Sequence, residues 1–186
     1  MRVAQHATLS DMLRPTDLYV LTGALANQGE MWSLRGLAEK LFVDHTVVSR
    51  ALKRAEEVGL YQSADRRVNP ANFAELMIHA ARFIAPAPLG GMTRGFRAAW
   101  ATTPISDLIR QAGDEPPPIW PSALGVDRGQ RLEPLHPAAV CASGDPTLDG
   151  LLAIIDCLRA GDARVRKVAA SVLEDELANV LDRAAL

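Results

Sequence analysis

The sequence contains few of the residues on which many catalytic and metal-binding sites depend. Only two cysteines occur among its 186 residues, Cys141 and Cys157, and they form neither a CxxC motif nor a nucleophile signature. Its four histidines are scattered and lack the spacing of metal ligands. We therefore expect both cysteines to be small hydrophobic residues in a reducing compartment, and we expect no metal centre and no cofactor.

Long apolar runs are also missing. No stretch approaches the ~18–20 apolar residues of a membrane span. The N-terminal residues MRVAQHATLSDMLRP lack the apolar region of a signal peptide. These absences predict a soluble, cytoplasmic protein without a membrane partner.

Motifs of nucleotide binding and catalysis are absent as well. Residues 89–95, LGGMTRG, match neither the GxxxxGK[ST] phosphate loop nor the GxGxxG dinucleotide motif, so a plain loop is expected there. Irregular spacing separates Asp145, Asp149, Asp156 and Asp162, so they do not fit a calcium loop. The sequence shows no Ser-His-Asp, Cys-His or paired-carboxylate pattern of a catalytic site. The sequence therefore predicts a protein that is not an enzyme.

Charge is distributed unevenly along the chain. Residues 1–100 carry 12 Lys and Arg against 9 Asp and Glu, whereas residues 101–186 carry 8 against 13. A basic first half beside an acidic second half is typical of a nucleic-acid reader joined to another region. Together with the Pro- and Gly-containing loops that separate the helical segments, this charge distribution predicts one domain over residues 1–84 and a second region over residues 85–186.

The first domain shows the pattern of consecutive short helices. We expect helices over residues 17–28, 33–42, 44–58 and 70–84. Thr16 or Asp17 is the expected N-cap of the first helix, because Pro15 blocks an earlier start. Ser33 and Asp44 are the expected N-caps of the second and third helices.

The helix over residues 44–58 has two different faces. Val48, Leu52 and Ala55 follow one another at helical spacing and are expected to pack on the preceding helix. The apolar stripe of that preceding helix is Leu34, Leu37, Ala38 and Leu41. The opposite, polar face carries His45, Thr46, Ser49, Arg50, Lys53 and Arg54. Two short helices joined by a tight turn, the second basic on its outer face, describe a helix-turn-helix.

The segments SLRGLAEKLFVDHTVVSRALKRAEEVGLY and SADRR resemble the winged-helix DNA-binding domain of MarR-like transcriptional regulators. The resemblance covers about residues 17–70 and rests on the pattern LA-x-x-L-x-V followed by V-S-R-x-L and a Gly-Leu stop. It implies a recognition helix in the major groove and a hairpin wing beyond the Gly-Leu. Residues 61–73 are short and poor in β-branched residues, so a long wing is not expected.

The chemistry of the side chains predicts a different type of DNA contact for different residues. Arg50 can present its guanidinium to guanine O6 and N7, a contact worth ~1–3 kcal/mol of discrimination. Residues at the N-terminus of the helix would lie nearest to base edges, hydroxyls would contact phosphates, and further cations would add salt-dependent affinity. Arg54 has an alternative role, an ion pair with Glu56 or Glu57. The predicted DNA-binding residues are Ser33, Arg35, His45, Thr46, Val47, Ser49, Arg50, Lys53, Arg54, Arg66 and Arg67.

The second region is less informative. We expect a loop over residues 86–95, a helical run over 96–112 that Pro104 interrupts, and a Pro- and Gly-rich extended segment over 113–137 with one or two short strands. Trp100, Ile119 and Trp120 could form a clamp between helices, line a small-molecule pocket or simply belong to the core.

The last forty residues predict two amphipathic helices that meet near Gly161 and Asp162. The first apolar stripe is Leu148, Leu151, Leu152, Ile155 and Leu158. The second is Val165, Val168, Ala169, Val172, Leu173 and Leu177, with Leu181 extending it. This helical hairpin could cover its own domain, a second subunit or a partner protein bound through residues 147–183.

The expected fold is mainly α, with an N-terminal winged helix-turn-helix domain and a helical C-terminal region that contains a Pro- and Gly-rich extended segment. Two functions remain open. The first is a sequence-specific transcriptional regulator, a repressor that binds double-stranded DNA as a homodimer, since helix-turn-helix proteins commonly read two half-sites. The second is an antitoxin-like or defence-associated protein whose C-terminal half binds a partner and whose N-terminal domain autoregulates its operon.

Overall fold

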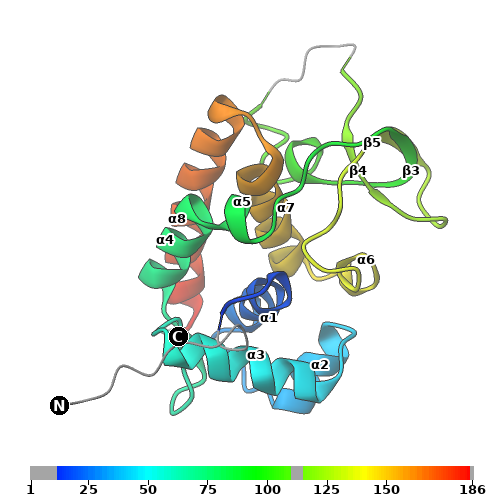
Figure 1. The fold of residues 1–186 in the computed structure, drawn as a ribbon. Helices are drawn as coiled ribbons and strands as arrows, with labels where there is room; N and C mark the ends of the chain where they lie inside the picture. The colour runs from blue at the N-terminus through cyan, green and yellow to red at the C-terminus, as the bar shows by residue number, and fades with distance from the viewer. Residues whose placement is uncertain (1–11, 110–114, 185–186) are drawn as a thin grey trace.

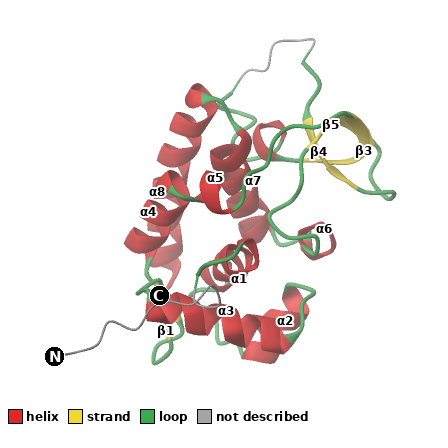
Figure 2. Cartoon of the chain, in the orientation of Figure 1, coloured by secondary structure: helices red, strands yellow, loops and turns green. Residues whose placement is uncertain are grey.

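The computed structural model describes residues 12–109 and 115–184. The expectations for residues 1–11 and 110–114 therefore lie outside the described residues. Within the described ranges the fold is mainly α, with small sheets at two places (Figures 1 and 2). The helices of the first half are α1 (Pro15–Ala26), α2 (Leu34–Lys40), α3 (His45–Glu57), α4 (Pro70–His79) and α5 (Ala81–Ile84).

Helix α1 is the central element of the molecule. Every residue from Asp17 to Leu25 is buried, and α1 packs against α3 on one side and against α7 (Pro146–Ala160) on another (Figure 1). The helix begins at Pro15, with Arg14 as its N-cap, so the expected caps Thr16 and Asp17 were wrong. Proline suits this first helical position because its missing N–H would have no partner there.

Helices α2 and α3 follow the predicted pattern closely. Ser33 Oγ accepts a hydrogen bond from Gly36 N at 3.0 Å, and Asp44 Oδ1 accepts one from Thr46 N at 2.7 Å, so both predicted N-caps are confirmed. Leu34 departs from its predicted stripe, because at the first position of α2 it is 41% exposed. The buried face of α3 consists of Val48, Ala51, Leu52 and Ala55.

A short hairpin separates α3 from α4. Strands β1 (Tyr61–Gln62) and β2 (Arg67–Val68) pair antiparallel over two residues each, as expected for a short segment. The helix expected over residues 70–84 is divided at Ala80 into α4 and α5.

The segment after α5 forms a small three-stranded barrel that projects from one side of the helices (Figure 2). Its strands are β3 (Met92–Arg97), β4 (Pro118–Pro121) and β5 (Asp127–Arg131), with β3 antiparallel to both others and β4 parallel to β5. The loop predicted over residues 86–95 and the helix predicted over 96–112 were therefore wrong where they overlap β3. The short 3-10 helix η1 (Ala99–Ala101) is the helical structure that follows it.

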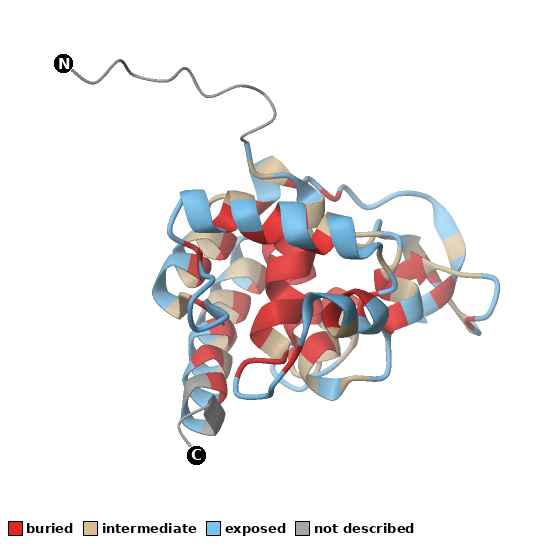
Figure 3. Ribbon diagram, turned by 90° about the horizontal axis from the view of Figure 1, so that it is seen from below, coloured by how far each residue is buried: buried red, intermediate tan, exposed pale blue. Residues whose placement is uncertain are grey.

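Three helices complete the chain, namely α6 (Ala139–Ala142), α7 and α8 (Ala163–Ala184). The predicted helical hairpin is confirmed, with its break at Gly161 and Asp162. Helix α7 is buried at Leu148 and from Leu151 to Arg159, so its apolar stripe belongs to the core. Buried residues gather at the centre of the molecule, where the helices face one another (Figure 3). None of the helices in the described ranges combines the length and the apolar character needed to cross a membrane.

Candidate nucleic-acid interface

The predicted recognition helix is held firmly from behind. Helix α3 packs on both α1 and α2, and its four inward residues are essentially inaccessible to solvent. Tyr19 of α1 donates a hydrogen bond from its hydroxyl to the carbonyl oxygen of Leu41, at 3.1 Å, in the turn between α2 and α3. Burial raises the pKa of the Tyr19 phenol, which therefore remains a neutral donor.

The outward face of α3 carries most of the predicted base-contacting residues. Thr46, Ser49, Arg50 and Lys53 are exposed, and His45 is exposed at the first helical position. Val47 is only half-buried. The four exposed residues from Thr46 to Lys53 occupy positions i, i+3, i+4 and i+7 of the helix, which places their side chains on one continuous side. The structure thus brings together two hydroxyls, a guanidinium and an ammonium, the donor groups that nucleic-acid readers use.

Arg54 is the main correction to the predicted contact set. Its Nε donates to Asp17 Oδ2 at 2.9 Å and its Nη2 donates to Asp17 Oδ1, which makes a bidentate ion pair with a carboxylate that is fully buried. The Arg54 side chain is only 16% exposed, and the pair raises its pKa. Arg54 therefore joins α3 to α1, and neither Glu56 nor Glu57 is its hydrogen-bonding partner.

The hairpin is attached to its surroundings at three points. Glu56 of α3 accepts hydrogen bonds from both the backbone N and the Oγ of Ser63, and these bonds lower the pKa of its carboxyl group. Gln28 Oε1 accepts a hydrogen bond from Val68 N at 2.9 Å. Arg66 donates to the carbonyl oxygen of Trp32 and lies 6.0 Å from the centre of its ring. The hairpin is thereby fixed beside the C-terminal end of α3.

Two of the other four predicted residues are engaged in contacts within the protein, and two face solvent. The Arg66 guanidinium is engaged with Trp32, which gives this residue a structural role in the hairpin. Arg67 is exposed in β2, and Arg35 is exposed on α2, so both cations face solvent. Ser33 is exposed, but its oxygen is occupied as the N-cap acceptor of α2.

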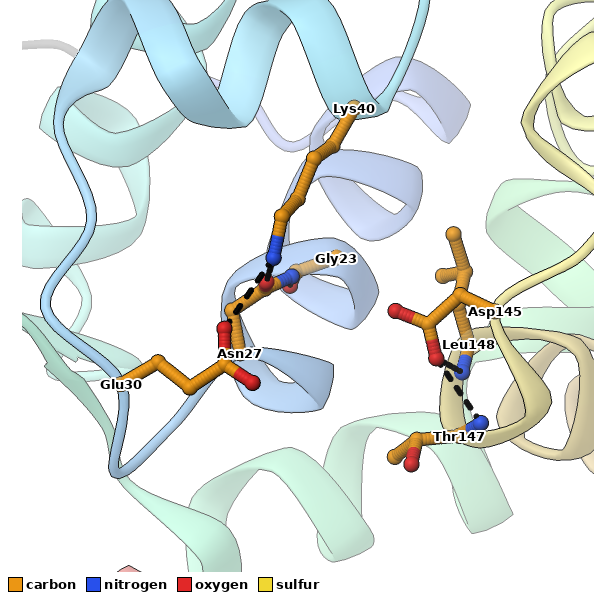
Figure 4. Close-up of polar contacts among 7 residues, drawn as sticks. All are labelled: Gly23, Asn27, Glu30, Lys40, Asp145, Thr147 and Leu148. Atoms are coloured by element: carbon orange, nitrogen blue, oxygen red, sulfur yellow. Dashed lines mark hydrogen bonds and ion pairs between the residues drawn. The ribbon is translucent and has the colours of Figure 1, made fainter.

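Helix α2 is fastened to the end of α1 by a polar cluster (Figure 4). Lys40 of α2 donates to Asn27 Oδ1 and forms an ion pair with Glu30 at 3.1 Å. Asn27 is buried, and its Nδ2 donates to the carbonyl oxygen of Gly23 at 2.8 Å. Because one buried amide connects both helices, the α2–α3 pair has a defined position relative to the core.

Asp44 is the carboxylate nearest to the start of α3. Hydrogen bonds from Thr46 to Asp44 lower the pKa of its carboxyl group, with a smaller contribution from His45. The carboxylate therefore stays ionised at the positive end of the helix dipole. It sets the helix N-terminus and at the same time reduces the local positive potential.

Sequence reasoning did not identify the residues that position this face. Asp17, Tyr19 and Glu56 act through contacts with residues 37, 22 and 7 positions away, which no local pattern reveals. The sequence feature that could have indicated the role of Asp17 is its position as a polar residue within an apolar helix. No group of three or more His, Cys, Asp or Glu side chains in the described ranges is arranged to hold a metal ion.

The expected partner surface over residues 147–183 is reduced by the structure. Because α7 is buried against α1, α5 and α8, its apolar stripe is not available to a partner. In this segment the exposed residues lie mainly on the outer side of α8.

Comparison with known proteins gave no relatives for this chain. No protein-family model matches it, and neither the curated proteins nor the solved structures contain a significant match. The interpretation of the α2–α3 face therefore rests on its own geometry and chemistry.

Proposed function

We propose that this protein is a sequence-specific DNA-binding transcriptional regulator with a winged helix-turn-helix domain, acting as a homodimeric repressor. The observation that carries the proposal is the outward face of α3, where Thr46, Ser49, Arg50 and Lys53 are exposed on a helix whose other face is buried. A rigid helix with such a face has the size and the chemistry to enter the major groove.

The neighbouring elements support the same orientation. The β1–β2 hairpin is fixed beside the end of α3 through Glu56 and Ser63, and Arg67 of β2 is exposed. A hairpin in this place can contact the phosphate backbone next to the groove that α3 occupies. Arg35 on α2 adds a further exposed cation.

The experiment is a DNA-binding assay on the full chain with DNA from upstream of its own gene, together with a selection from random duplexes. Arg50→Ala should weaken binding to the selected site by about 5- to 150-fold and relax the base preference at one position. Lys53→Ala should weaken binding to all sequences alike and reduce the slope of log affinity against log salt by about 1.

Arg164→Ala is the matched control, because it removes the same charge from the start of α8, at the far end of the molecule from α3 (Figure 1). It should leave binding unchanged. Absence of binding at low salt, or equal losses from Arg50→Ala and Arg164→Ala, would refute the proposal. Light scattering of the free and the DNA-bound protein measures the number of subunits. A monomer in both states would refute the homodimer part of the proposal.

A further inference from the structure

A cavity of about 290 Å³ lies between the barrel and the N-terminal half of α7. On the barrel side it is lined by Phe96 and Trp120, which are directly opposite each other on β3 and β4. On the helix side it is lined by Pro146, Asp149, Gly150 and Ala153. Since Gly150 and Ala153 have almost no side chain, the helix leaves open space in front of the two aromatic rings.

The aromatic wall of the cavity is fixed in position. Trp120 Nε1 donates a hydrogen bond to Asp156 Oδ2 at 2.6 Å, and Asp156 is itself paired with the buried Arg159. Trp120 as a whole is only 7% exposed. A ring held in this way presents a preorganised surface and loses little conformational entropy when a ligand binds.

The polar residues that line the cavity are Arg97, Thr102, Thr103, Ser143 and Asp149, and Asp149 is the acidic one among them. Its Oδ2 accepts hydrogen bonds from Gly144 N at 2.9 Å and from Ser143 Oγ at 3.5 Å. Its Oδ1 accepts none from the residues that the structure describes, and no cation among them pairs with it. Burial raises the pKa of this carboxyl group, and the nearby Asp145 carboxylate adds to the effect.

The cation at the edge of the cavity does not compensate this charge. Arg97 lines the same cavity, but its Nε donates to Asp127 Oδ1 at 3.0 Å, which forms an ion pair on the barrel. The cavity therefore combines a carboxylate that lacks a counter-charge with two aromatic rings. This combination favours a cation over an anion or a neutral molecule, through both the carboxylate and the ring faces.

We propose that this cavity binds a small planar cation, an amidinium, guanidinium or aromatic amine, whose N–H groups donate to Asp149 while its flat body packs against Phe96 and Trp120. A planar donor group can meet the open Oδ1 with a charge-assisted hydrogen bond. The cavity volume is at the small end of the range for ligand sites, which limits the ligand to about one ring with its substituent. This binding site is independent of the proposed DNA-binding face.

The test uses benzamidine as the cationic probe and benzamide as its neutral counterpart of the same shape. Binding to the full chain is measured by calorimetry and by ligand-observed NMR. Benzamidine should bind with a Kd on the order of 1 mM or lower and at least about tenfold more tightly than benzamide.

Asp149→Asn removes the charge but keeps an oxygen that can accept from Gly144 N, and it should abolish the preference for benzamidine. Ala153→Leu fills the cavity without changing charge, and it should weaken both probes. Glu174→Gln, an exposed carboxylate on α8 that does not line the cavity, is the control with the same charge change and should leave both affinities unchanged. Equal binding of the two probes to the native chain, no binding of benzamidine, or benzamidine binding that survives both cavity variants would overturn the proposal.

Discussion

The two arginines on α3 at positions 50 and 54 have different environments despite their similar place in the sequence. Arg50 is exposed, whereas Arg54 is paired with the buried Asp17 on the central helix. Removing one partner of a buried ion pair leaves an uncompensated charge in the protein interior, which is strongly unfavourable. If substitution of Arg50 weakens DNA binding, the cause is a lost contact with DNA. If substitution of Arg54 does so, the cause is the loss of the ion pair that joins α3 to α1.

We expect Arg54→Ala to lower the free energy of unfolding by about 3 kcal/mol, because Asp17 loses its bidentate partner. Arg50→Ala should change stability by less than about 0.5 kcal/mol, as for other exposed positions. Urea unfolding of both variants measures the difference. The double variant Asp17→Asn with Arg54→Gln should recover part of the loss, since no charge then remains buried. Equal stability of the two single variants would contradict the role assigned to Arg54.

The buried Asp156 predicts a specific pH dependence of stability. Burial raises its pKa to about 6, an effect that the Arg159 guanidinium and the Trp120 indole N–H offset only in part. The ordinary value of 3.8 applies to the unfolded chain. As the pH falls, the folded chain takes up the proton first, so the contribution of Asp156 to stability is full below pH 3.8 and is lost as the pH rises through about 6.

Comparison of the native chain with Asp156→Asn isolates this contribution, because the other carboxyl groups titrate alike in both. Between pH about 7.5 and pH about 4.5, the native chain should gain roughly 2 kcal/mol relative to the variant. Chemical unfolding at a series of pH values gives the difference. A difference that stays constant, or that changes in the opposite direction, would show that the carboxyl pKa is not raised.

At the level of secondary-structure elements, the barrel depends on a close approach of its strands at Gly95. A Cβ atom on Gly95 would lie 1.8 Å from the carbonyl oxygen of Trp120, which is backbone and cannot turn aside. Gly95 also pairs with residues on both neighbouring strands, so a displacement there disturbs the whole barrel. Glycine is required at this position for lack of space.

Gly95→Ala should therefore destabilise the protein by about 2 kcal/mol or more. Gly91→Ala provides the control, since a Cβ at Gly91 would meet no atom within 4 Å. Near-UV circular dichroism follows the packing of Trp120, and urea unfolding gives the free energy. If both alanine variants are as stable as the native chain, the strands are not as close at Gly95 as described.

Across the whole molecule, one continuous hydrophobic core extends through both predicted regions. Helix α1 of the first region packs on α7 of the second, and α4 packs on α8 (Figure 1). Arg159 of α7 donates from its Nε to the carbonyl oxygen of Ala85 at 2.7 Å, directly at the boundary between the two predicted regions. Neither side can bury its apolar residues without the other.

We therefore expect both regions to unfold in a single cooperative transition. In Trp32→Phe, fluorescence reports only on Trp100 and Trp120 of the second region, whereas far-UV circular dichroism reports on all helices. The two signals should give the same urea midpoint and the same slope. A fluorescence transition clearly separated from the loss of helix would show that the regions are independent folding units.

The parts of the fold that follow from local patterns were predicted well. The helical spacing of Val48, Leu52 and Ala55 and the capping side chains Ser33 and Asp44 define α2 and α3, because these interactions connect residues within one or two turns. The break of the C-terminal hairpin at Gly161 was predictable for the same reason. Strands β4 and β5 lie in the segment where one or two short strands were expected. Strand β3 and the barrel were not predicted, since β3 pairs with both other strands across more than twenty residues of sequence and has few of the residues that favour strands.

By itself, the sequence determined which face of α3 is apolar and which is polar, because the helical period fixes that division. It also determined that the last forty residues form two helices. Only the tertiary structure decided that Arg54 and Arg66 are used in packing, that α7 is enclosed by its neighbours, and that Asp149 lies beside Phe96 and Trp120 at a cavity. These outcomes depend on contacts between residues distant in the sequence, and such contacts are set by how the helices and the barrel pack together.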